Sequence, residues 1–158
     1  MSFISDIKRF KVKASGNMEK TVRGTALSMF SHIITRTPRD TGRLVGNWQV
    51  SFNGYGRSQL QRKETHQGAN KRASARVNKY KAGDTIYMVN NLPYARVIEY
   101  GLYTGGGKPQ RVRRKGRMVT EIRTTAAGFS TQAPKGMVGI VKREFKQTMK
   151  RNAGRVNR

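Results

Sequence analysis

Residues 3 to 33 carry apolar side chains at the spacing of an amphipathic helix. The apolar positions recur every three or four residues, at Phe3, Ile7, Phe10, Ala14, Met18, Val22, Ala26, Met29 and Ile33. The phase is kept across Ser15-Gly16-Asn17, so the pattern predicts one long helix with at most a kink at the glycine. Such a helix would extend for about 45 to 50 Å, which is more than a small domain can cover. We therefore expect its Phe3 to Phe10 end to pack on a neighbouring subunit.

The helical period stops at Thr37-Pro38, because proline disfavours the α region for the residue before it. Pro38, Asp40 and Gly42 are typical turn residues. From Leu44 onward the period becomes two, which predicts a half-buried strand with the only tryptophan at its middle. The residues on its apolar face are Leu44, Gly46, Trp48, Val50 and Phe52.

Three further elements follow along the chain. Thr85 to Asn90 is apolar on both faces, which predicts a second strand that is either central in its sheet or covered by a partner. Tyr94 to Tyr100 predicts a short helix that ends at Gly101, with Arg96 and Glu99 paired on its surface. Weak alternation at Val119 to Thr125 predicts a third strand.

The last predicted element is an amphipathic helix that begins near Pro134, a favoured first-turn residue, and runs to about Arg151. Its apolar stripe consists of Met137, Val141, Phe145 and Met149. We expect residues 152–158 to form a flexible tail.

Length and composition predict a single domain over residues 1–158 that needs neither disulfides nor metals, since the chain has no cysteine. No apolar run approaches the roughly 18 residues of a membrane span, and the N-terminus lacks the apolar core of a signal peptide. We therefore expect a soluble protein, made in the cytoplasm of its host, that makes no membrane contact.

Charge distinguishes this chain more than any other property, with 33 Lys and Arg against 8 Asp and Glu, a formal net charge of +25. The excess is concentrated in three segments: residues 55–82 with a net charge of +7, residues 102–117 with +6, and residues 142–158 with +6. The first two segments show no sustained period and predict long, mobile basic loops.

Three interpretations of the basic loops remain open: a solvated surface, sequence-independent contact with nucleic-acid phosphates, and docking onto acidic proteins. The candidate contact residues for DNA or an acidic partner are Arg57, Arg62, Lys63, Lys71, Arg72, Arg76, Lys108, Arg111, Arg113, Arg114, Lys115 and Arg117.

Catalytic chemistry finds little support in the sequence. Neither His32 nor His66 has a second histidine or carboxylate at ligand spacing, so no metal site is expected. Asp40 and Glu99 are better explained as a turn residue and a helix-surface residue than as a catalytic carboxylate pair. The segment TGGGKP lacks the GxxxxGK[ST] pattern of a phosphate loop. We expect no enzymatic activity and no cofactor.

Two short motifs resemble those of the tailed-phage neck and tail-completion family, typified by minor tail components of lambda-like phages. Members of that family show a Pro-x-Asp-Thr-Gly-x-Leu run before a strand and an Asn-x-x-x-Tyr-Ala-x-x-Ile/Leu-Glu-Tyr/Phe-Gly run, followed by a proline-led C-terminal helix. The residues that match here are Pro38, Asp40, Thr41, Gly42 and Leu44, then Asn90, Tyr94, Ala95, Ile98, Glu99, Tyr100 and Gly101, and finally Pro134. We interpret these residues as structural, and we add Trp48 to them as the residue that anchors the sheet.

The resemblance implies an α+β fold with a long N-terminal helix, a small antiparallel sheet, a C-terminal helix and long basic loops. It also implies a non-enzymatic virion protein that completes the tail and forms a ring, matching the sixfold tail, around the DNA channel at the head–tail junction. Its partners would be other copies of the chain, neck and tail proteins such as the connector, tail terminator or tail tube, and packaged double-stranded DNA. The alternative, from charge alone, is a free-standing sequence-independent nucleic-acid-binding protein.

Overall fold

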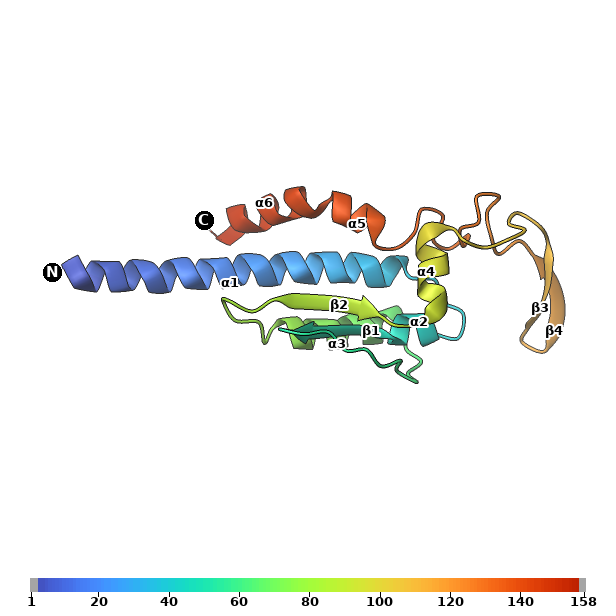
Figure 1. The fold of residues 1–158 in the computed structure, drawn as a ribbon, viewed down its shortest axis with the longest axis horizontal. Helices are drawn as coiled ribbons and strands as arrows, with labels where there is room; N and C mark the ends of the chain where they lie inside the picture. Colours follow the sequence, from blue (N-terminus) through green and yellow to red (C-terminus); the bar gives the residue numbers. More distant parts are fainter. Residues whose placement is uncertain (1–2, 157–158) are drawn as a thin grey trace.

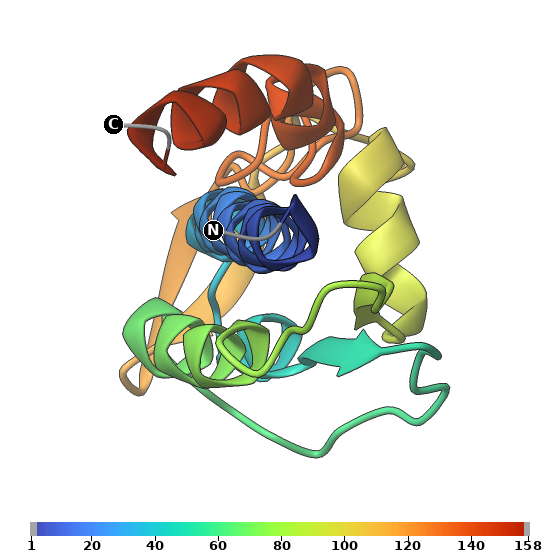
Figure 2. The ribbon, with the colours of Figure 1, turned by 90° about the vertical axis from the view of Figure 1, so that its left-hand side faces the viewer.

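The longest element of the fold is helix α1 (Phe3–Arg36), around which the other elements are arranged in the computed structural model of the chain (Figure 1). The structure describes residues 3–156. The helix is continuous through Ser15-Gly16-Asn17, which confirms the prediction of one long helix. Seen along its axis, α1 lies between the C-terminal helices on one side and α3 with β1 on the other (Figure 2).

The turn after α1 differs from the predicted strand start. Residues Arg43–Gly46 form a single helical turn, α2, and strand β1 begins only at Trp48 and ends at Phe52. Gly42 adopts a left-handed conformation with φ 83°, and its carbonyl oxygen accepts hydrogen bonds from the amides of Gly46 (2.9 Å) and Glu64 (3.1 Å). A side chain at Gly42 would collide with the backbone of Glu64, so this close approach requires glycine.

Strand β1 pairs antiparallel with β2 (Ile86–Asn90), with Trp48 opposite Asn90 and Phe52 opposite Ile86. This confirms the second strand, but β2 is not central, because the sheet has only these two strands. All five residues of β2 are half-buried, so neither face of the strand is fully covered.

Residues 55–82 are not one loop, because they contain helix α3 (His66–Val77). Thr65 caps its first turn by accepting a hydrogen bond from the amide of Gly68 at 3.1 Å. The buried face consists of Ala69, Ala73 and Val77, which pack against α1 and β1. The spacing of four is helical, but two of the three residues are alanine, so the apolar signal in the sequence is weak.

Residues 102–117 also contain regular structure. Strand β3 (Gln110–Arg114) pairs antiparallel with β4 (Arg117–Glu121). Lys115 and Gly116 make the connection with φ of 47° and 82°, the left-handed pair that a two-residue hairpin turn requires. The predicted third strand at Val119 to Thr125 is therefore shifted toward the N-terminus, and it belongs to a second two-stranded sheet. We call β3–β4, residues 110–121, the basic hairpin.

The glycine run before the basic hairpin is packed against a neighbouring loop. The amide of Gly107 donates to the carbonyl oxygen of Thr124 at 2.9 Å. A Cβ at Gly106 would collide with the carbonyl oxygen of Thr125. Close backbone packing thus explains this glycine.

Helix α4 (Pro93–Tyr100) confirms the predicted short helix and ends at Gly101, whose φ is 67°. The expected pairing of Glu99 with Arg96 is wrong. The Glu99 carboxylate instead accepts hydrogen bonds from the backbone amides of Met137 (2.7 Å), Val138 (2.9 Å) and Gly139 (2.8 Å).

These three amides lead into α5 (Gly139–Arg143), so the C-terminal helix does not begin near Pro134 as predicted. Pro134 lies in a turn before it, and α6 (Phe145–Val156) follows α5 after Glu144. The break between the two helices changes which residues face the interior. Met137 and Val141 are buried as expected, whereas Phe145 and Met149 are exposed.

The buried positions of α6 are polar, namely Thr148 and Asn152. The Asn152 amide donates to the carbonyl oxygen of Thr148 (3.0 Å) and to the hydroxyl of Thr25 on α1 (3.4 Å). The predicted flexible tail 152–158 is therefore wrong for residues 152–156, which are helical, while residues 157–158 lie outside the described part of the chain.

The core lies where α1, α2, β1, α3, α4 and α5 meet, near the C-terminal end of α1. It includes Ile34, Val45, Trp48, Ile98 and Met137, each at most 5% exposed. The fold is α+β, with a long N-terminal helix, two small antiparallel sheets and a C-terminal helix pair.

Candidate assembly and nucleic-acid interface

The two motif segments contact each other directly. The side-chain amide of Asn90, which opens the second motif, donates to the carbonyl oxygen of Leu44 in the first at 2.9 Å. Trp48, which follows the first motif, is 5% exposed, and its indole Nε1 donates to the Thr37 hydroxyl at 2.8 Å. These contacts join α2 to the end of β2, and the residue after α1 to the start of β1, which supports a structural role for these residues.

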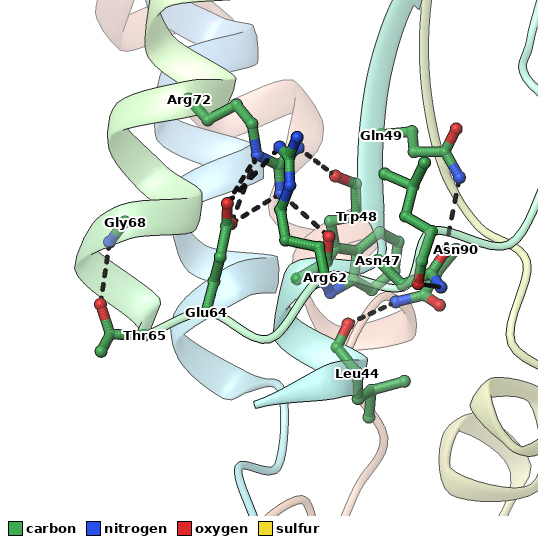
Figure 3. Close-up of polar contacts among 12 residues, drawn as sticks. Leu44, Asn47, Trp48, Gln49, Arg62, Glu64, Thr65, Gly68, Arg72 and Asn90 are labelled. Carbon is green, nitrogen blue, oxygen red and sulfur yellow. Dashed lines mark hydrogen bonds and ion pairs between the residues drawn. The ribbon is translucent and has the colours of Figure 1, made fainter. Parts of the chain in front are cut away.

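Arg72 is a structural residue in this structure (Figure 3). From α3, its guanidinium pairs with the Glu64 carboxylate at 2.8 Å and donates to the carbonyl oxygens of Trp48 (2.7 Å) and Gly46 (3.1 Å). One side chain thus connects α3 to the start of β1. Because these internal partners engage its guanidinium, contact of Arg72 with DNA or an acidic partner stays a prediction.

The other candidates in residues 55–82 lie in different surroundings. Arg57 lies 5.9 Å from the ring centroid of Tyr55, and Arg76 lies 5.4 Å from that of Phe52. Arg62 pairs with Glu64 at 3.5 Å. Lys63 and Lys71 are exposed. The structure therefore spreads these side chains over a long segment and does not gather them into one site.

Four charged residues attach the basic hairpin to the turn after α1. Arg114 pairs with Asp40 (2.9 Å) and Glu121 (3.1 Å), and Arg123 pairs with the same two carboxylates at 3.0 and 3.3 Å. Hydrogen bonding to Arg123, with the charges of Arg123 and Arg114, lowers the pKa of Asp40 below its ordinary value of 3.8. We call these four residues the ion network; it contains two positive and two negative charges and is neutral as a unit.

The remaining cations of the basic hairpin have no carboxylate within ion-pair distance among the described residues. They are Arg111, Arg113, Lys115 and Arg117, and all four are exposed. Lys108, in the loop before β3, is exposed as well. Arg114 is neutralised by the ion network. The other four predicted contact residues of the basic hairpin therefore remain together on one protruding element (Figure 1).

A polar hollow of about 380 Å³ lies beside the ion network. Both motifs line it, through residues such as Asp40, Arg43, Tyr94 and Ile98. Arg43 Nε and Thr124 Oγ1 are buried without a hydrogen-bond partner in residues 3–156, and both residues line this hollow. Burial raises the pKa of the Tyr94 phenol above 10.0, so the phenol is neutral at pH 7.

The N-terminal end of α1 forms the second uncovered surface. Phe3 is 77% exposed, Ile7 50% and Phe10 74%. Figure 1 shows this end of the helix extending past the other elements, on the side of the molecule opposite the basic hairpin. The predicted uncovered stripe is therefore present; what covers it remains a prediction.

The described residues were considered for two further features, a metal-binding cluster and a membrane-spanning helix. Residues 3–156 contain no group of three or more His, Cys, Asp or Glu side chains placed to hold a metal ion. Within the same residues, no helix combines the length and hydrophobicity that a membrane crossing needs.

No protein-family model matches the chain, and neither does any curated protein or solved structure.

Sequence reasoning missed three residues of this interface, Glu64, Glu121 and Arg123. Glu64 lies 8 residues before Arg72 and 20 residues after Leu44, the last residue of the first motif, so no local spacing links it to both. The basic hairpin carried only a weak local signal. The glycine of Lys115-Gly116 suits a left-handed turn position, but neither Gln110–Arg114 nor Arg117–Glu121 alternates apolar and polar residues.

Proposed function

We propose that this chain is a structural virion protein of a tailed bacteriophage, which completes the tail and forms part of the head–tail junction. Copies of the chain associate there as a ring around the DNA channel, and neighbouring neck and tail proteins bind that ring. The chain acts by assembly and has no catalytic role.

The observation that carries the proposal is the direct contact between the two motif segments, made by Asn90 and the carbonyl group of Leu44. The resemblance to the tail-completion family rests on the order and spacing of these segments along the chain. Their contact at the core gives both motifs one structural task, as expected if they specify a shared subunit fold.

The uncovered end of α1 supports association with other copies. Phe3, Ile7 and Phe10 recur on one side of the helix and are at least half exposed. An apolar stripe of this kind on a soluble protein marks an interaction surface. A heterologous contact of this stripe with a different surface of the next copy closes into a ring when the rotation per subunit allows it, and the basic hairpin at the opposite end of the elongated subunit (Figure 1) stays free to face the DNA.

A free-standing, sequence-independent nucleic-acid-binding protein is the second candidate. The four unpaired cations of the basic hairpin and the net charge of +25 favour it. The two candidates differ in one respect: only the first makes particle assembly depend on this chain.

Interrupting the gene in the phage that encodes it separates the two. We expect filled heads and free tails that fail to join, with joining restored by the wild-type gene supplied in trans. An Ile7→Asp/Phe10→Asp variant should not restore joining, because two carboxylates replace the apolar stripe. The matched control Lys8→Gln/Lys13→Gln makes the same change in net charge on the same helix and should restore it. Normal joining without the gene would refute the proposal.

A further inference from the structure

The basic hairpin has two chemically different faces. Side chains alternate between the faces of a strand, so Arg111 and Arg113 lie on the face opposite to Arg114. Their cross-strand partners are Thr120 and Met118, respectively. We call these four residues the outward face. All four are exposed.

The opposite face is fixed by the ion network. Arg114 and Glu121 lie on it, and Arg114 reaches Asp40 at 2.9 Å in the turn after α1. This attachment orients the hairpin, so the outward face points away from Asp40. Lys115, the first residue of the two-residue turn, places a further positive charge at the tip of the hairpin. Arg117 is the cross-strand partner of Arg114, so it lies at the tip on the face of the ion network.

We propose that the outward face and tip of the basic hairpin bind the backbone of double-stranded DNA, with the two-stranded ribbon lying along the major groove. The groove is about 12 Å wide and admits a two-stranded β-ribbon. Arginine and lysine side chains at its rims contact phosphates and release condensed counterions. The inference deepens the proposed function and rests on it for the source of the DNA, which is the packaged genome.

The composition of the outward face favours DNA over an acidic protein. Protein interfaces have apolar cores from which charged residues are depleted. Here Met118 is the only large apolar side chain on the face, beside two arginines with no carboxylate partner in residues 3–156. The face lacks the amide side chains that read adenine and the carboxylates that read cytosine. Its arginines can contact phosphates or guanine edges, and binding to duplexes of unrelated sequence distinguishes the two.

Salt-dependent binding of the full-length protein to a 30-base-pair duplex tests this proposal without phage particles, so it can fail independently of the proposed function. Fluorescence anisotropy gives the slope of log K against log salt concentration for the wild type and for Arg111→Gln/Arg113→Gln. We expect the variant to reduce the magnitude of that slope by about 1.8, which is about 0.9 for each lost phosphate contact. Two duplexes of unrelated sequence should give the same change.

The matched control is Lys146→Gln/Lys150→Gln on α6, which removes the same charge from exposed positions outside the hairpin. It should leave the slope within about 0.3 of the wild-type value, because it removes no phosphate contact. Equal slope changes in the two variants, or no binding by the wild type, would overturn the proposal. Unchanged urea midpoints show that both variants fold.

Binding to poly-L-glutamate, used as a second probe, distinguishes an acidic protein partner from DNA. We expect the hairpin variant to bind it as the wild type does. If the variant loses polyglutamate binding and keeps DNA binding, the hairpin is a docking site for acidic protein and the DNA proposal is wrong.

Discussion

The indole of Trp48 donates a hydrogen bond to the hydroxyl of Thr37 over 2.8 Å, which connects the end of α1 to the first residue of β1. Both side chains are at most 5% exposed, and the Thr37 hydroxyl also donates to the carbonyl oxygen of Ile33. Thr37→Val keeps the shape of the side chain but leaves the indole without a partner. We expect it to lower the free energy of unfolding by about 1 to 3 kcal/mol.

Thr37→Ser is the control, because it keeps the hydroxyl and removes only a methyl group, at a cost of about 1 kcal/mol. Trp48 is the only tryptophan, so urea unfolding followed by its fluorescence measures both variants directly. Equal losses in the two variants would show that the hydrogen bond contributes nothing beyond packing.

Substitution of Arg72 tests whether this residue stabilises the fold or contacts DNA. Arg72→Lys keeps the charge but cannot reach Glu64, Trp48 and Gly46 together, because lysine lacks the planar fork of arginine. We expect a loss of about 1 to 3 kcal/mol in the free energy of unfolding, with little change in the salt dependence of DNA binding. Lys71→Gln, at the exposed neighbouring position, should leave the urea midpoint unchanged. A stable Arg72→Lys variant with weaker DNA binding would support Arg72 as a contact residue.

Glu99 holds the start of the C-terminal helices through three backbone amides. Glu99→Ala leaves these donors without their carboxylate, and we expect a loss of about 2 to 4 kcal/mol, since hydrogen bonds to charged groups contribute about 1.5 to 3 kcal/mol each and water replaces part of the loss. Glu99→Gln keeps one acceptor oxygen and should cost less. Hydrogen exchange at Met137, Val138 and Gly139 provides the local measurement: exchange as slow as in the wild type would contradict the assignment.

The ion network predicts a pH dependence. The pKa of Asp40 in the folded protein is below its ordinary value of 3.8, chiefly because of the hydrogen bond with Arg123. The carboxylate therefore contributes stability that is fully present above pH 3.8 and is lost as the pH falls through the folded-state pKa. Carboxyl NMR titration should show the Asp40 pKa rising toward 3.8 in Arg123→Gln, and rising less in Arg114→Gln. An unchanged pKa in Arg123→Gln would show that this ion pair does not form in solution.

Several elements could be predicted from the sequence because their signals are local. The apolar stripe gives α1, and the Tyr94 to Gly101 run gives α4 with its glycine cap. Helix α3 was missed because its buried face is formed mainly by Ala69 and Ala73, which add little apolar signal to a polar segment. In α6 the buried residues are Thr148 and Asn152, so the apolar stripe indicated the wrong face.

Which basic residues form internal ion pairs and which stay exposed could not be predicted from the sequence, because the ion pairs join residues far apart in the chain. In the sequence, Arg72 and Arg114 cannot be told apart from their neighbours Lys71 and Arg113, because all four are basic residues in segments rich in lysine and arginine. The structure separates them by their partners: Glu64 for Arg72, and Asp40 with Glu121 for Arg114. Asp40 and Arg114 are 74 residues apart, a distance at which residue type alone indicates no pairing.

The central claim is that this chain is a structural part of the head–tail junction. A cryo-electron microscopy map of purified particles from the phage that encodes it tests that claim most directly. We predict a ring of copies at the junction, with the Phe3 to Phe10 end of α1 covered by a neighbouring subunit and the basic hairpin facing the DNA. Particles with complete necks that lack this chain, or density for it elsewhere in the virion, would contradict the account.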